Sequence, residues 1–186
     1  VVIIPIGDDE KVNNLAKIYN EMLNKNDITC YIDNSEKSPG FKFAEAEVNG
    51  IPIRIEIGKR DLENNNVTFV RRDTREKIVE SKDIDVINYT KELLNTIQND
   101  MYKTAKERMD KLTFTAHNLT DMKNILNTQP GFIHADWCGD EECELKIKEI
   151  KGCKSRCILE EEKLIDGKCV CCGREAKHHV VWGIQY

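Results

Sequence analysis

The sequence lacks any long hydrophobic run. No stretch of the 186 residues approaches the ~20 apolar residues that a membrane-spanning helix needs. The first residues also lack a basic segment followed by an apolar run and a cleavage site, so we predict no secretory signal. Internal repeats and low-complexity linkers are missing too, which excludes a repeat array. We expect a protein without a membrane partner.

An excess of positive charge is also missing. The net charge of −5 argues against non-specific nucleic-acid binding over the whole surface. Charge is uneven, however: between Lys37 and Arg75 eight Lys/Arg residues face six Asp/Glu residues, a local net charge of +2. A local basic face can still bind phosphates.

The composition, with 40% hydrophobic and 33% charged residues, is that of a globular protein with room for one ordinary domain and a small one. The chain opens directly on Val1, Val2, Ile3 and Ile4, without an initiator Met or a polar lead-in. A buried strand at the first residue suggests a part cut from a longer protein.

Four cysteines near the end form two short-spaced pairs. Cys138 and Cys143 are spaced C-x4-C, and Cys169 and Cys172 are spaced C-x2-C. Two such pairs can supply the four tetrahedral ligands of a structural zinc site, which leaves no open position for chemistry. Seven of the eight cysteines fall within residues 138–172, and this clustering favours a metal site in a reducing cytoplasm over secreted disulfides. The alternative is a set of buried or redox-active thiols.

The remaining cysteines leave the ligand assignment partly open. Cys171 is adjacent to the second pair, and Cys153 and Cys157 lie between the pairs, where we expect them not to be ligands. Cys30 lies in an apolar segment and is expected to be a small buried side chain.

Hydrophobic periodicity predicts an α/β fold for the first part of the chain. A strand at 1–6, a helix and a strand at 28–32 form a β-α-β unit with parallel strands. A helix through Val48 and three further strands complete a mixed sheet of about five strands; these strands are expected at 51–57, 67–70 and 78–79. The expected result is a three-layer domain.

The strand at 51–57 alternates cleanly, with four isoleucines on one face and Arg54 on the other. We expect the Arg54 face to be open to solvent or to a ligand. A helix is expected from Asp83 to about Phe114, with a buried stripe formed by Leu94, Ile97, Met101, Ala105 and Leu112. The predicted domains are 1–98, a connecting helix at 99–117, and a small α+β zinc-containing domain at 118–186.

Three segments together resemble one family. They are SPGFKFAEAEVNGIPIRIEIGKRDLE (Ser38 to Glu63), VRRDTREK (Val70 to Lys77), and WCGDEEC (137–143) joined to CVCCG (169–173) and a terminal WGIQY. The chain resembles the C-terminal part of prolyl-tRNA synthetase of the archaeal and eukaryote-like type, with its anticodon-binding domain and zinc-containing C-terminal domain. One departure is Ala46, which replaces the aromatic residue usual in the family.

The resemblance implies a function and a set of partners. The intact enzyme would be a class II proline–tRNA ligase in the cytoplasm, a homodimer that binds the tRNA for proline and charges it with ATP and Mg²⁺. The catalytic core would belong to the same polypeptide before Val1, so this chain alone is not expected to be catalytic. Tyr186 would reach toward that core.

The resemblance also implies that four residues recognise the anticodon: Phe43, Glu47, Arg54 and Arg60. Proteins read unpaired bases by stacking on aromatic rings and by hydrogen bonds to base edges. A carboxylate accepts from the N1–H and N2–H groups of guanine, and an arginine donates to its O6 and N7. Lys42, Lys59, Arg71 and Arg72 are weaker candidates for phosphate contacts.

Other interpretations of these residues stay open. One of Phe41 and Phe43 is expected to pack in the core, Glu47 can be a solvated helix residue, and Arg54 can pair with Glu56. At the level of function, the alternatives are a free-standing RNA-binding or zinc-ribbon interaction module, and a dithiol oxidoreductase that uses Cys169 and Cys172.

Overall fold

The structure is a computed structural model that describes residues 1–159 and 163–184. The chain forms two compact units, Val1–Lys103 and Thr104–Tyr186. Tyr186, expected to reach toward a catalytic core, lies outside the described residues. In the part of the chain that is described, the structure contains no helix with the length and apolar character needed to cross a bilayer.

The first unit contains the predicted mixed five-stranded sheet, in the order β2-β1-β3-β4-β5. Its first three strands in space are parallel and the last two are antiparallel to their neighbours. The strands are β1 (Val2–Ile6), β2 (Tyr31–Ile32), β3 (Ile53–Gly58), β4 (Asn66–Arg71) and β5 (Lys77–Ser81).

Strand β2 is shorter than the expected 28–32. The Asn24 side chain accepts from the Cys30 amide at 3.1 Å and donates to the Cys30 carbonyl at 2.8 Å. It thereby takes the place of a neighbouring strand at Cys30. Ile28 and Cys30 are still buried in the core, as their apolar character predicts.

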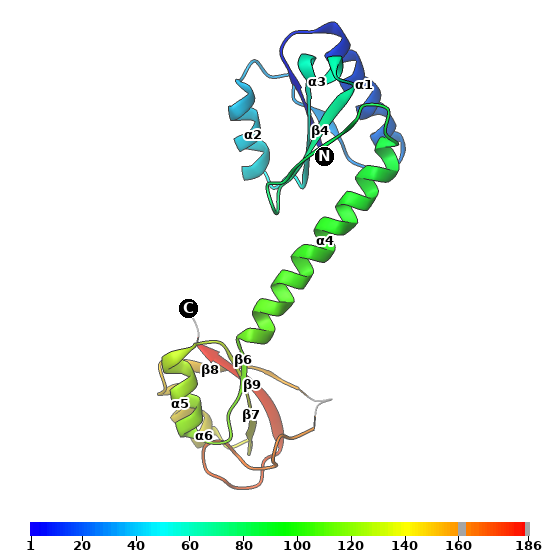
Figure 1. Ribbon diagram of the computed structural model, residues 1–186. Helices are drawn as coiled ribbons and strands as arrows, with labels where there is room; N and C mark the ends of the chain where they lie inside the picture. Colours follow the sequence, from blue (N-terminus) through cyan, green and yellow to red (C-terminus); the bar gives the residue numbers. More distant parts are fainter. Residues whose placement is uncertain (160–162, 185–186) are drawn as a thin grey trace. The chain divides into compact units, whose positions relative to one another are not determined.

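Helices cover both faces of this sheet, which confirms the three-layer architecture (Figure 1). Helix α1 (Glu10–Lys25) begins at Asp9, whose side chain caps the first turn by accepting from the amides of Lys11 and Val12. One apolar stripe of α1 and the first part of α4 (Val86–Lys111) pack against the isoleucine face of β3. Helix α2 (Pro39–Val48) covers the opposite face.

The expectation that the Arg54 face is open to solvent is wrong. Ala46 of α2 is buried with Val2 and Ile4 of β1, and Arg54 is only 6% exposed. Alternation along a strand shows which residues share a face, but it does not show whether a helix covers that face. Alanine at position 46 is small enough to let the backbone of α2 lie close to the sheet.

The long helix also differs from the prediction. Helix α4 ends at Lys111, and Thr113–Thr115 forms the short strand β6 rather than a helical turn. Ile97 is buried, but every residue from 101 to 111 is exposed, including Met101 at 52%. The predicted stripe is therefore a buried face only in the first half of the helix.

The second unit is the predicted α+β domain. Its sheet has the strand order β6-β7-β9-β8, with β6 parallel to β7 and the other pairs antiparallel. Trp182, Met122 and Leu126 are fully or almost fully buried in its core. The elements are β7 (Phe132–Trp137), β8 (Cys153–Ile158), β9 (His178–Ile184), α5 (Leu119–Thr128) and α6 (Glu141–Lys148).

Candidate metal centre and nucleic-acid interface

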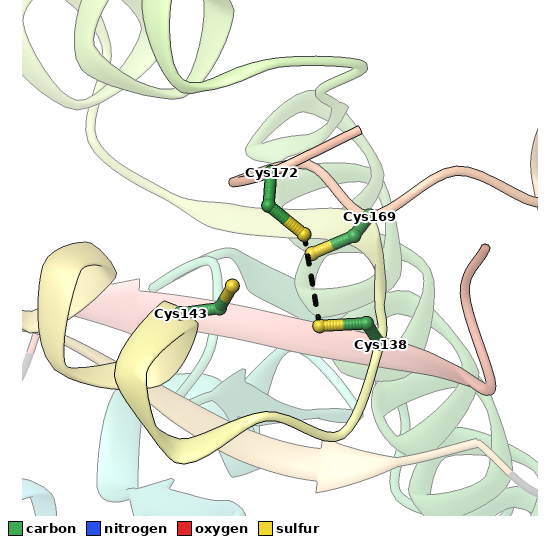
Figure 2. Close-up of side chains that lie close together, drawn as sticks. All are labelled: Cys138, Cys143, Cys169 and Cys172. Atoms are coloured by element: carbon green, nitrogen blue, oxygen red, sulfur yellow. Dashed lines mark hydrogen bonds between the residues drawn. The ribbon is translucent and has the colours of Figure 1, made fainter. Parts of the chain in front are cut away.

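The structure brings the four predicted cysteine ligands together in the second unit. The sulfur atoms of Cys138, Cys143, Cys169 and Cys172 all lie within 4.8 Å of one another and point toward a common centre (Figure 2). The Cys138 and Cys172 sulfurs are 3.9 Å apart. Zinc–sulfur bonds of about 2.3 Å in a tetrahedron require sulfur separations of about 3.8 Å. The site therefore fits a tetrahedral metal ion such as zinc.

The first pair is placed by the junction between β7 and α6. Cys138 follows β7, and the chain then turns at Gly139, whose φ of +87° is disfavoured for side-chain-bearing residues. Asp140 caps α6 by accepting from the amide of Glu142 at 3.0 Å. The cap fixes the first turn of α6, and that turn carries Cys143.

The second pair lies on a tight loop before β9. The amide of Gly173 donates to the carbonyl of Cys169 at 2.8 Å, and Gly173 has a φ of +70°. Arg174 then donates to the Cys172 sulfur at 3.2 Å and to Asp140 at 2.6 Å. Arg174 therefore connects the loop of the second pair to the cap of α6 beside the first pair.

Three of the clustered thiols, those of Cys138, Cys143 and Cys172, have shifted pKa values. Burial raises the pKa of Cys138 and of Cys143, so neither ionises readily alone. The hydrogen bond from Arg174 instead lowers the pKa of Cys172 to about 6. A metal ion supplies the positive charge that lets all four become thiolates.

The structure also separates these four from the other cysteines. Cys171 is half-buried beside the cluster, but its sulfur is not among the four that lie within 4.8 Å. Cys153 is fully buried in the core of the second unit, and Cys157 is exposed on β8. Burial raises the pKa of Cys30 to about 11, which keeps it a neutral side chain as expected.

In the first unit, Arg54 is the centre of a polar cluster under α2. Its Nε donates to Glu56 at 2.9 Å, and its Nη1 lies 3.6 Å from the Glu47 carboxylate. The guanidinium lies 4.4 Å from the centroid of the Phe43 ring. Arg54 thus contacts two other predicted anticodon residues, Phe43 and Glu47, and it also pairs with Glu56.

The fourth predicted residue is separate. Arg60 lies on the short helix α3 (Lys59–Glu63), which follows the opposite end of β3 from Arg54. It is exposed. Of the two phenylalanines, Phe43 packs against the core under α2, and Phe41 is 56% exposed with Lys37 over its ring at 4.9 Å.

The Arg54 cluster also contains two basic residues that were not predicted from the sequence. Lys77 pairs with Glu56 at 3.1 Å and lies 5.6 Å from the Phe43 ring centroid, and Arg75 approaches Glu47 at 3.9 Å. Pairing across the sheet places Arg54 opposite Val70, and Val70 opposite Lys77. The short turn between β4 and β5 could therefore have predicted from the sequence that Lys77 lies near Arg54.

The weaker phosphate candidates of β4 have different surroundings. Arg71 is buried and pairs with Asp73 at 2.7 Å and with Asp100 of α4 at 2.6 Å, so it joins β4 to α4. Arg72 is exposed and donates to the Glu47 carbonyl at 2.8 Å. Lys42 is buried, and Lys59 is exposed beside Arg60.

Comparison with known proteins accounts for both halves of the chain. Residues 1–96 match the family described as "Anticodon binding domain". The chain belongs to that family. Residues 119–186 match "Prolyl-tRNA synthetase, C-terminal", which confirms the predicted resemblance to the C-terminal part of prolyl-tRNA synthetase.

Curated relatives with the name proline–tRNA ligase align along the whole chain. The relative from Clostridium novyi is 46% identical over 187 residues, which is 100% of this chain and 39% of the relative. A relative from Lachnospira eligens is 45% identical over 189 residues, and one from Clostridium botulinum is 42% identical over 186 residues, covering 39% and 38% of those proteins. This chain thus spans about two fifths of the length of these relatives.

Proposed function

We propose that this chain recognises the anticodon of a proline tRNA as the C-terminal part of a proline–tRNA ligase. The observation that carries the proposal is the cluster of Arg54, Glu47 and Phe43 in a domain of the anticodon-binding family. The relatives named proline–tRNA ligase and the match of residues 119–186 support the identity of the amino acid.

The burial of Arg54 supports a positioning role for this residue. Its side chain is 8% exposed, whereas that of Glu47 is 36% exposed. The Glu47 carboxylate can accept from the N1–H and N2–H groups of a guanine, while Arg54 and Arg75 hold its orientation. Lys77 and Arg72 border the same surface and supply positive charge for the RNA backbone. Arg60, at the other end of β3, is proposed to make a separate contact to the RNA.

The second unit stabilises this part of the enzyme through zinc. Zinc held by Cys138, Cys143, Cys169 and Cys172 would cross-link two loops and supply no catalytic chemistry, because four protein ligands fill its coordination sphere. ATP and Mg²⁺ would bind the catalytic domain, in the portion of the relatives that this chain does not span. The intact ligase is proposed to be a cytoplasmic homodimer.

The proposal is tested by the affinity of the chain for tRNA. Filter binding at a fixed salt concentration should show preference for tRNA with a proline anticodon over the same tRNA with both anticodon guanines replaced by adenine. Glu47→Gln should reduce this preference by about 1–3 kcal/mol, because the amide donates where guanine also donates. Glu63→Gln, an exposed change on α3, is the charge-matched control. Equal affinity for both tRNAs would overturn the proposal.

A further inference from the structure

A cavity of about 510 Å³ opens in the first unit at the carboxyl ends of the parallel strands β1 and β2. Pro5, Ala16 and Ile32 contribute an apolar wall, and the loops that follow the two strands contribute a polar rim. Clefts at the carboxyl ends of parallel strands are a common location of ligand sites in α/β sheets. The cavity is distinct from the Arg54 cluster described above.

Three polar side chains of the cavity have no partner among the residues that the structure describes. The side chains of Asn13, Lys17 and Asn34 make no hydrogen bond or ion pair with any residue that the structure describes. Asn13 and Lys17 lie on α1, and Asn34 follows β2. These side chains can therefore form hydrogen bonds to a ligand in place of water without breaking a contact within the protein.

Asp33 is the fixed polar group of the cavity. Its Oδ1 accepts from the Ser35 amide at 3.0 Å, and the buried Lys42 donates to the Asp33 carbonyl at 2.9 Å. Burial opposes ionisation, but the Ser35 hydrogen bonds and the charge of Lys42 outweigh it, so the pKa of Asp33 is below its usual value. The other carboxylate oxygen, Oδ2, makes neither of these contacts and can accept from a ligand.

The charges around the cavity do not favour a phosphate. Three carboxylates, Asp8, Asp33 and Glu36, line it against two lysines, Lys17 and Lys42, and Lys42 already pairs with Asp33. The Asp9 side chain already accepts from the Lys11 and Val12 amides, so the start of α1 does not offer these groups to an anion. A ligand that presents hydroxyl or amine donors to a carboxylate fits better than one that presents phosphate oxygens.

We propose that this cavity binds a ribonucleoside unit, with a ribose hydroxyl donating to Asp33 and the base lying against the apolar wall. In βαβ nucleotide sites an acidic residue after the second strand accepts from the ribose hydroxyls, and Asp33 follows β2 in the same way. A free nucleoside and a nucleotide of bound tRNA offer the same chemistry. The second source rests on the proposed function, and it is favoured because Lys42 of the cavity and Phe43 of the Arg54 cluster are consecutive residues of α2.

The experiment follows the amide NMR spectrum of the ¹⁵N-labelled chain during titration with adenosine and with 2′-deoxyadenosine. Adenosine should shift the amides of residues 33–36 with a millimolar affinity, and the deoxynucleoside should bind about fivefold more weakly, because it lacks one donor. Asp33→Asn should weaken adenosine by about tenfold, since a hydrogen bond to a charged acceptor is lost. Asn13→Ala is a second variant in the cavity wall. Glu21→Gln removes one negative charge at an exposed position of α1, as Asp33→Asn does in the cavity, and it should not change the affinity for adenosine.

A second arm identifies the source of the nucleoside. An anticodon stem-loop RNA is prepared with single 2′-deoxy substitutions, and each is bound to the wild-type chain and to Asp33→Asn. A tRNA source predicts one position whose substitution weakens wild-type binding about fivefold and leaves the variant unchanged. If no position responds while adenosine still binds, a free nucleoside is the ligand.

The proposal is overturned if adenosine and 2′-deoxyadenosine bind equally, if Asp33→Asn binds adenosine like the wild type, or if neither adenosine nor any RNA position gives a response. These outcomes are separate from the test of anticodon recognition. Adenosine binding with no preference for the proline anticodon would remove the proposed function and leave this site in place.

Discussion

The first unit buries a large apolar core between its sheet and helices α1 and α4, whereas the second sets four cysteines beside a smaller core. In the first unit, Ile3, Ile55 and Phe69 are fully buried under α1 and α4. In the second, the thiol cluster and Arg174 connect the loops that carry Cys138 and Cys169, together with a backbone hydrogen bond from Val170 to Asp136. Small domains bury a smaller fraction of their surface, so a metal ion held by the thiol cluster would replace part of the missing burial.

The two units also handle buried charge differently. In the first unit, Arg54 and Arg71 are buried with carboxylates already supplied by the protein. In the second, burial raises the pKa of the Cys143 thiol, and a bound cation would favour its thiolate. The first unit therefore supplies the counter-charges of these buried arginines itself, whereas in the thiol cluster of the second burial still opposes the thiolate of Cys143.

The largest expected effect is the loss of the metal ion, which should destabilise the second unit and leave the first folded. Cys143→Ser should abolish stoichiometric zinc and destabilise the second unit by at least about 4 kcal/mol, because three remaining ligands hold zinc weakly. Amide NMR signals of the first unit should persist. Metal analysis and thermal melting measure both effects, and Cys157→Ser, an exposed thiol outside the cluster, is the control. Full zinc content in Cys143→Ser, or four thiols that react freely in the wild type, would contradict the metal centre.

The next effect concerns buried charge in the first unit. Arg54→Met should reduce the free energy of unfolding by about 3 kcal/mol, because among the described residues Lys77 alone then remains to pair with the buried Glu56 carboxylate. Urea denaturation measures this loss. Arg60→Met, at an exposed position, should change stability by less than about 0.5 kcal/mol. A stable Arg54→Met chain would show that Arg54 is not held as the structure describes.

A third comparison lies within α4, between two residues one turn apart. Ile97→Ala should reduce the free energy of unfolding by about 2–4 kcal/mol, because the side chain is 4% exposed. Met101→Ala, at 52% exposed, should reduce it by less than about 0.5 kcal/mol. Similar losses for the two variants in urea denaturation would show that something covers the second half of α4 in solution.

The smallest effect is a pH dependence in the first unit. The hydrogen bond from Arg71 holds the pKa of Asp73 below its usual range. This contribution is complete above the unfolded pKa of about 4 and is lost as the pH falls through the lower folded value. Asp73→Asn should therefore flatten the acid side of the stability profile, below pH 4, by about 1 kcal/mol or less. Urea melts between pH 2 and 5 would measure it, with the exposed Asp27→Asn as the control. An unchanged slope would argue against the Arg71–Asp73 pair.

Much of the architecture was predictable because it depends on local patterns. The isoleucines of β3 and the stripe of α1 repeat with the periods of strand and helix. Cysteine spacing likewise predicted which thiols meet, although adjacent Cys171 and Cys172 could not be distinguished. The loop ending at Gly173 turns the Cys172 sulfur inward.

The sequence by itself determined most of the order of helices and strands, the residues that share a strand face, and the two cysteine pairs of the candidate metal centre, because these follow from periodicity and short loops. Only the tertiary structure decided that α2 covers Arg54, that Lys77 joins its cluster, and that the second half of α4 is exposed. Each of these depends on which distant segment packs on a given face, and a local repeat contains no information about that partner.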